Sequence, residues 1–80
     1  MPEFQTNEYI TKDIGEAAAL ITQNQKLIRM DREGNVCWFI FDDKKECEKL
    51  SNQFFFDNLQ VNAREYYEAQ TRLKNRIFSR

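Results

Sequence analysis

The sequence contains no histidine, and its 80 residues include only two glycines, one proline and two cysteines. Without histidine the chain cannot form a Ser-His or Cys-His nucleophile pair, and it lacks the commonest transition-metal ligand. Gly15 and Gly34 stand too far apart for a glycine-rich phosphate loop. Cys37 and Cys47 match no metal-ligand spacing. We therefore expect no catalytic residue, no metal and no cofactor, and we expect that the protein is not an enzyme.

A strong charge and a long apolar segment are also missing. The net charge is −1, so no overall field favours nucleic acid or a membrane surface. The longest apolar run, Val36–Phe41, is far shorter than the ~20 residues that span a bilayer, and no signal peptide is recognisable. Two cysteines are too few for a disulfide-stabilised secreted domain and are expected to be buried free thiols. These features predict a cytoplasmic protein without a membrane partner.

Apolar and aromatic residues are plentiful. Hydrophobic residues make up 41% and aromatic residues 14% of the chain, which is enough to offset chain entropy on folding. A chain of this length forms one domain with a thin core. We predict a single small domain over residues 1–80, with an ordered core of about residues 8–78.

A repeated capping pattern predicts three helices. An Asx residue precedes a Glu by three positions at Asp13–Glu16, Asp43–Glu46 and Asn62–Glu65. The Asx side chain can accept a first-turn N–H group, and the Glu can reach back to the N–H of the cap. The predicted helices cover Ile14–Gln23, with Asn24 as a left-handed C-terminal cap, then Lys44–Phe56, then a third helix from Ala63 to Ile77. The short link Asp57–Val61 favours an antiparallel helical hairpin.

The remaining segments predict strands at Tyr9–Thr11, Lys26–Asp31 and Val36–Phe41. The four-residue connection Arg32–Asn35 contains Gly and Asn, which is typical of a β-hairpin that needs positive φ. Val36–Phe41 is apolar on both faces, so it is either a central strand or part of a sheet with an exposed aromatic face. The predicted order is β-α-β-β-α-α. The fold class is α+β, with a short, mostly antiparallel sheet packed by helices.

Adjacent carboxylates Asp42 and Asp43 follow the apolar strand, where α/β folds often place functional groups. Neighbouring strand residues point to opposite faces, however, and Asp43 has a capping role. Asp13 is in the same position before its own helix. We interpret these carboxylates as helix caps and solvated groups rather than as catalytic residues.

The third helix carries two patterns. Its predicted core-facing side contains Ala63, Tyr66, Tyr67, Gln70, Leu73 and Ile77. Its outer side carries an arginine ridge, in which basic residues and one glutamate recur every four positions: Arg64, Glu68, Arg72, Arg76 and Arg80. Glu68 stands four residues before Arg72, the favourable order for an ion pair. The ridge is either a solvated face or a site for phosphates or acidic protein groups. We expect it to lie apart from an edge formed by Tyr67 and Phe78.

Three consecutive aromatic residues, Phe54, Phe55 and Phe56, end the second helix. A regular helix cannot turn all three toward one core, so Phe55 or Phe56 is expected at the surface, as an anchor for a partner or for self-association. The alternative is a bend that buries all three.

Several segments resemble an uncharacterised small-domain family of bacteria, phages and mobile elements. The similarity rests on the Tyr-x-Thr-x-Asp pattern of Tyr9–Asp13, the Phe-x-Phe-x-Asp pattern of Phe39–Asp43 and the Leu-Lys pattern at Leu73–Lys74 in the C-terminal helix. It covers about residues 9–77. The resemblance implies no activity, and it implies an accessory protein that modulates a host or defence complex.

These features predict a non-catalytic protein-interaction module. Its predicted contact residues are Arg64, Arg72, Arg76, Arg80, Phe55 and Phe56. The alternative is a weak nucleic-acid-binding accessory protein that uses the basic C-terminal helix, because so few arginines neutralise only a few phosphates. A homo-oligomer is a further expectation, since small cores often gain stability by association.

Overall fold

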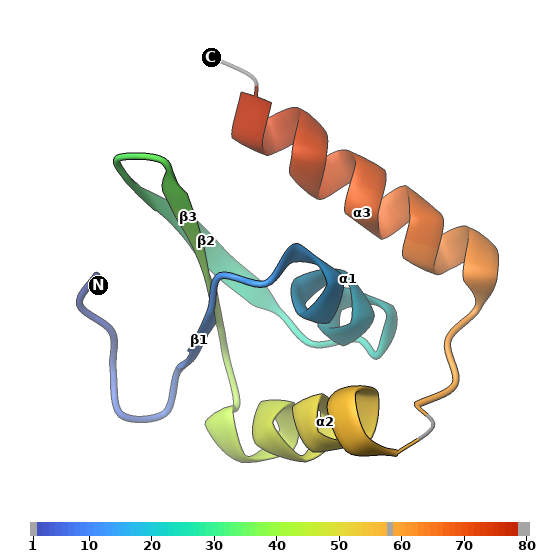
Figure 1. The fold of residues 1–80 in the computed structure, drawn as a ribbon. Helices are drawn as coiled ribbons and strands as arrows, with labels where there is room; N and C mark the ends of the chain where they lie inside the picture. Colours follow the sequence, from blue (N-terminus) through green and yellow to red (C-terminus); the bar gives the residue numbers. More distant parts are fainter. Residues whose placement is uncertain (1, 58, 79–80) are drawn as a thin grey trace.

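The computed structural model describes residues 2–57 and 59–78, and their elements follow the predicted β-α-β-β-α-α order. Figure 1 shows a small sheet with helices against one side of it. The elements are β1 (Tyr9–Thr11), α1 (Ile14–Thr22), β2 (Leu27–Glu33), β3 (Val36–Phe41), α2 (Lys44–Phe56) and α3 (Ala63–Phe78). The predicted α+β class is confirmed.

The three strands form a sheet in the order β1-β3-β2, and β3 pairs antiparallel with both neighbours. In this central position both edges of β3 are paired, and its second half, Phe39–Phe41, is buried on both faces of the sheet. Phe39 and Phe41 point into the core beneath the helices, while Ile40 points to the other face, and none of the three is more than 1% exposed. Of the two alternatives for this segment, the central strand is correct.

A turn of only two residues, Gly34 and Asn35, joins β2 to β3. Gly34 has a φ of 61°, which a glycine adopts without steric cost and which suits the twist of a tight hairpin. The predicted four-residue connection was wrong, because Arg32 continues β2 and pairs with Cys37. The positive φ expected in this turn is confirmed at Gly34.

The three predicted helix caps are confirmed. The side chains of Asp13, Asp43 and Asn62 accept the N–H groups of Glu16, Glu46 and Glu65 at 2.9, 3.3 and 3.0 Å. The predicted return bond from Glu16 to the cap is wrong, because the Asp13 N–H donates to Thr11 Oγ1 instead. At the other end of α1, Asn24 has a φ of 66° and forms the predicted left-handed cap. These termini are local structures, which explains why spacing alone identified them.

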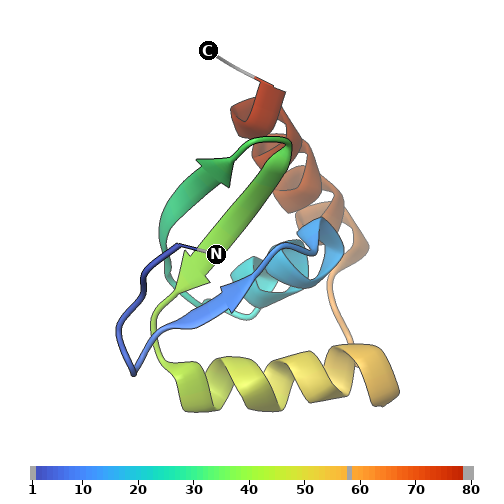
Figure 2. The same cartoon turned by 60° about the vertical axis from the view of Figure 1, so that its left-hand side comes forward.

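Helix α1 lies at the centre of the helical layer. It packs against α3 and α2, whereas α2 and α3 diverge from their connecting segment, as Figures 1 and 2 show. The predicted antiparallel hairpin of the last two helices was therefore wrong. The small side chains of Ala17, Ala18 and Ala19 are at most 1% exposed and allow the neighbouring elements to approach α1 closely.

Candidate functional site

Among the described residues, one side of α3 packs against the rest of the protein. Ala69 and Leu73 are buried, and Tyr66 and Ile77 pack at the margin of the core. Tyr67, which was predicted to face the core, is 68% exposed, so that prediction was wrong. A helix turns about 100° per residue, and Tyr67 therefore points almost opposite to Ala69 two positions later. The outward side of α3 thus presents aromatic as well as charged residues.

The arginine ridge is only partly paired. Arg64 Nε lies 3.7 Å from Glu68 Oε2, and the side chain of Arg64 is 88% exposed. The predicted ion pair of Glu68 with Arg72 is not the one that forms. Arg72 and Arg76 are exposed, and among residues 2–57 and 59–78 neither has a carboxylate partner. Arg80, the last predicted member of the ridge, lies outside the described residues.

A shallow groove on α3 brings aromatic and basic side chains together. Its volume is about 250 Å³, and its lining residues are Tyr67, Glu68, Thr71 and Arg72. The edge formed by Tyr67 was predicted to lie apart from the arginine ridge. That prediction is wrong, because Tyr67 of the edge and Arg72 of the ridge line the same groove. A second groove, of about 310 Å³, lies between the end of α1 and the other flank of α3 and also includes Glu68 and Arg72. Arg72 therefore borders both grooves.

The end of α2 exposes two of its three phenylalanines. Phe55 is 49% and Phe56 is 82% exposed, which confirms that one of them lies at the surface and excludes burial of all three. The ring of Phe54 is half-buried and meets the ring of Phe55 edge to face at a centroid distance of 4.9 Å. A Cβ added to Gly15 would lie 3.7 Å from Phe54 and 3.2 Å from the Tyr66 hydroxyl, so the Phe54 ring lies close to the first turn of α1. The two exposed rings therefore follow one that packs beside α1.

The predicted contact residues form two separate surfaces. Phe55 and Phe56 end α2, whereas Arg64, Arg72 and Arg76 follow the length of α3. No hydrogen bond, ion pair or ring contact joins the two sets within the part of the chain that the structure describes. A single partner would have to be large enough to contact both.

A buried polar cluster was not predicted. Glu16 is 4% exposed, and its carboxylate accepts hydrogen bonds from the Tyr9 hydroxyl and, at 2.6 Å, from the Thr11 hydroxyl. Ser51 Oγ lies 3.1 Å from the Tyr9 hydroxyl oxygen, so the cluster joins β1, α1 and α2. Burial, followed by the hydrogen bond to Glu16, raises the pKa of Tyr9 from 10.0 to about 12, so its hydroxyl remains a donor well into the alkaline range.

The sequence did contain a signal for this cluster. The residues that follow Glu16 up to Ile21 are all apolar, and a helix that is apolar around its whole circumference is buried along with its polar members. Tyr9 and Thr11 stand two residues apart in β1, so their side chains lie on the same face of the strand and supply the two hydroxyls. Among the described residues every buried side-chain polar atom has a hydrogen-bond partner. The cluster is thus a satisfied structural network that leaves no polar atom directed at a ligand.

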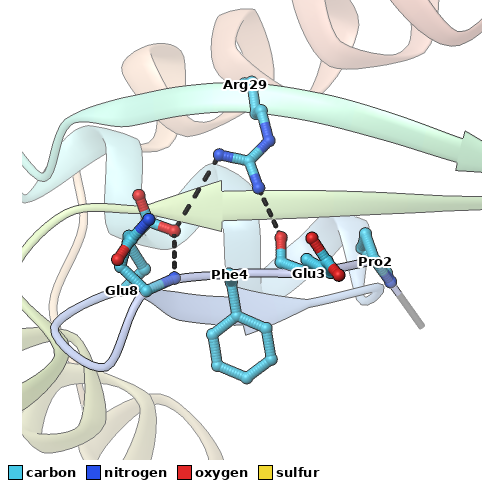
Figure 3. A pocket seen from close by; sticks show the side chains of 6 residues that line it. Pro2, Glu3, Phe4, Glu8 and Arg29 are labelled. Atoms are coloured by element: carbon cyan, nitrogen blue, oxygen red, sulfur yellow. Dashed lines mark hydrogen bonds and ion pairs between the residues drawn. The ribbon is translucent and has the colours of Figure 1, made fainter.

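A further hollow lies over the face of the sheet that the helices do not cover. It measures about 510 Å³ and is bordered by the N-terminal segment and Arg29. Arg29 pairs with Ile40 across the strands, so both side chains are on this face. In Figure 3 the Arg29 guanidinium lies between Glu8 and the Glu3 carbonyl. Arg29 Nη1 is 3.9 Å from Glu8 Oε1, and Arg29 Nη2 donates a hydrogen bond of 2.6 Å to the Glu3 carbonyl oxygen. Asp31 adds a carboxylate at 2.9 Å. Two carboxylates thus neutralise Arg29, which serves to hold the N-terminal segment against the sheet.

Both cysteines are free. Burial raises the pKa of the Cys47 thiol to about 12, with the nearby acidic residues adding to the effect, and burial also raises the pKa of Cys37. A protonated thiol is a poor nucleophile at neutral pH. Within the described residues no group of His, Cys, Asp and Glu side chains is arranged to hold a metal ion. None of the described helices has the length and apolar character needed to cross a membrane.

Comparison with known proteins places the chain in a family. Residues 6–79 match a family model described as a domain of unknown function, DUF5659. No curated protein and no solved structure matches the chain. The matched segment includes every helix and strand of the fold and begins just before β1. The chain therefore belongs to the DUF5659 family of uncharacterised domains.

Proposed function

We propose that this domain is a non-catalytic protein-interaction module whose main contact is the exposed aromatic pair Phe55 and Phe56. The observation that supports this most is that two adjacent phenyl rings, 49% and 82% exposed, end a helix in a domain whose core is small. Exposed aromatic residues are energetically costly in water and are enriched among the residues that dominate protein interfaces.

The geometry of the pair suits a binding anchor. The Phe54 ring lies near the first turn of α1, and its edge-to-face contact gives the Phe55 ring a packing partner within its own domain. Rings that are already ordered lose little conformational entropy on binding. Arg72 and Arg76, which have no carboxylate partner among the described residues, add a second contact for acidic groups of the same partner.

The proposed setting follows from other features. The free, buried thiol of Cys47 suits the reducing cytoplasm. The resemblance to small domains of bacteria, phages and mobile elements supports a role as an accessory protein that modulates a host or defence complex.

Quantitative affinity capture from the native cells tests the proposal. Three tagged baits are compared: the wild type, the Phe55→Ser/Phe56→Ser variant and a Tyr67→Ser/Phe78→Ser control that also removes two exposed aromatic residues. Each aromatic anchor typically contributes about 2 kcal/mol, so the Phe55/Phe56 variant should retain a specific partner at least about tenfold less well. The control should retain it fully. Circular dichroism confirms that each bait is folded. If no captured protein depends on Phe55 and Phe56, the proposal is wrong.

A second function, weak binding of single-stranded nucleic acid, is favoured by the groove that Tyr67 and Arg72 line together. Bases stack on aromatic rings while basic side chains neutralise phosphates. Fluorescence anisotropy with a labelled oligonucleotide at low salt tests this function. Binding should weaken with Tyr67→Ala and with Arg72→Ala, and it should fall as salt is added. Absence of binding even at low salt would eliminate this alternative.

A further inference from the structure

Four exposed residues, which we name the α2 stripe, follow one line along α2 and end at the aromatic pair. They are Lys45, Lys49, Asn52 and Phe56, separated by four, three and four residues. A helix turns about 100° per residue, so this spacing keeps the four side chains within an arc of about 60°. Figures 1 and 2 place α2 along one edge of the fold, with the sheet and α1 on one side of it.

The α2 stripe lies opposite to the side of α2 that packs in the domain. The buried residues of the helix are Cys47, Leu50 and Ser51, and the half-buried Phe54 continues the same side. At about 100° per residue, the middle of this packed side lies about 180° around the helix from the middle of the stripe. A partner can therefore contact the stripe without displacing α2 from the core.

The two lysines of the α2 stripe carry charges that the domain does not match. Within the described part of the chain, neither Lys45 nor Lys49 forms an ion pair or a hydrogen bond through its ammonium group. Two glutamates of the same helix, Glu46 and Glu48, project to either side of the stripe rather than along it. The stripe therefore presents two positive charges and no negative one.

Apolar area and charge follow one another in a fixed order along the α2 stripe. Phe56 is 82% exposed, and its ring centroid lies 6.5 Å from that of Phe55. With a rise of about 1.5 Å per residue, Phe56 stands about 10 Å from Lys49 and about 16 Å from Lys45 along the helix axis. An apolar side chain of a partner can pack on the two rings, while carboxylates placed toward the start of α2 meet the lysines.

This arrangement suits an acidic protein segment better than other anionic ligands. Two lysines neutralise too few phosphates for more than weak binding of nucleic acid. Two aromatic rings at one end of the helix give too little apolar area for insertion into a lipid surface. A protein segment requires only one apolar anchor and a few carboxylates within about 16 Å of it.

We propose that the α2 stripe binds an acidic segment of a partner protein, whose apolar side chain packs on Phe55 and Phe56 and whose carboxylates face Lys49 and Lys45. This inference rests on the proposed function and names the chemistry of its partner. Charge complementarity along the stripe determines the direction of the bound segment, with its acidic part toward the start of α2.

Selection from a phage-displayed library of random peptides of about 16 residues tests this preference, because such peptides span the stripe as a helix or in extended form. Peptides enriched on the wild type should combine an apolar anchor with acidic residues on one side of it. Lys45→Glu/Lys49→Glu should enrich basic residues in place of the acidic ones and keep the apolar anchor. Lys26→Glu/Lys74→Glu makes the same change in net charge at exposed positions elsewhere and should keep the wild-type preference.

Fluorescence anisotropy with one selected acidic peptide measures the contribution of each part. Lys45→Glu/Lys49→Glu should weaken binding by at least about tenfold, because repulsion replaces attraction. Phe55→Ser/Phe56→Ser should weaken it by at least about tenfold through loss of the anchor. A rise in NaCl from about 50 to about 500 mM should weaken wild-type binding several-fold, since salt screens exposed charges. Circular dichroism confirms that every variant is folded.

Three results would overturn this inference. The first is enrichment of peptides that depend on Phe55 and Phe56 without an acidic preference, which would leave the proposed function intact. The second is a selection in which no enriched peptide depends on the α2 stripe, whereas capture from the native cells still decides the proposed function separately. The third is absence of an acidic-peptide preference together with binding of phosphatidylserine vesicles or of a labelled oligonucleotide that Lys45→Glu/Lys49→Glu abolishes, which would assign the lysines to lipid or nucleic acid.

Discussion

Helices α1 and α3 differ in how many of their residues are buried. In α1, the five consecutive residues from Glu16 to Leu20 are buried, whereas in the longer α3 only Ala69 and Leu73 are. The difference follows from position, because α1 has the sheet, α2 and α3 around it, while α3 has neighbours on one side only. We therefore expect α1 to contribute most to the stability of the domain, and α3 to offer a surface for binding.

The largest predicted effect removes apolar volume from α1. Leu20 is 1% exposed and belongs to the core cluster. Leu20→Ala should lower the free energy of unfolding by about 2–5 kcal/mol, because it loses buried methyl groups and leaves a cavity. Urea denaturation followed by circular dichroism measures the change. A loss below about 1 kcal/mol would contradict the assignment of α1 as the centre of the core.

A pair of glutamates sharpens the comparison between the helices. Glu16 and Glu65 occupy the same position, three residues after the caps of α1 and α3, but Glu16 is buried and Glu65 is exposed. Glu16→Ala should cost about 1–3 kcal/mol, because it leaves the hydroxyls of Tyr9 and Thr11 without their acceptor. Glu65→Ala should cost less than about 1 kcal/mol, the usual effect of losing a charge at a helix start. If the two variants lost the same free energy of unfolding in the same denaturation assay, the hydrogen bonds of the buried cluster would add nothing to the stability of the domain.

Alkaline pH should destabilise the buried cluster. Tyr9 has a pKa of about 12 in the folded protein and 10.0 as its ordinary value. As pH rises, the unfolded chain therefore releases this proton first, and the stabilising contribution present below pH 10 is lost between pH 10 and 12. The pKa of the Cys47 thiol is raised from its ordinary value of 9.0 to about 12. Deprotonation of this thiol in the unfolded chain therefore adds a loss of stability that starts near pH 9.

Comparison of the wild type with Tyr9→Phe isolates the contribution of Tyr9. The variant should be less stable at neutral pH, because it lacks the hydrogen bond to Glu16, and its stability should fall less steeply from pH 10 to 12. Thermal unfolding at a series of pH values measures both quantities. Identical slopes for the two proteins would contradict the assigned role of the Tyr9 hydroxyl.

The smallest effect is expected at Tyr67, on the exposed side of α3. Tyr67→Ala removes a ring that is 68% exposed, so the free energy of unfolding should change by no more than about 0.5 kcal/mol at concentrations where the chain is monomeric. The same denaturation assay, carried out at low micromolar concentration, provides the check. A larger loss would mean that Tyr67 supports the core of its own chain and would remove the contrast with α1.

The candidate surfaces were only partly predictable from sequence. Exposure of Phe55 and Phe56 followed from helix geometry, since three consecutive side chains cannot share one face. Tyr67 was assigned to the wrong side of its helix because it neighbours Tyr66 and both are amphipathic. The burial of Ala69 instead of Tyr67 depends on how closely α3 approaches α1, which no pattern within α3 contains. The ion pair of Glu68 with Arg64 rather than Arg72 likewise depends on local side-chain placement.

Features that depend on near neighbours in the chain could be predicted from the sequence. These are the order of elements, the caps at Asp13, Asp43 and Asn62, and the left-handed residues Asn24 and Gly34, because capping and turn geometry extend over only a few residues. The position of α1 between the other helices, the burial of Glu16 and the outward direction of Tyr67 could not be predicted in this way. Each of these is set by contacts between segments far apart in the chain, and close packing selects among arrangements that the local patterns allow equally.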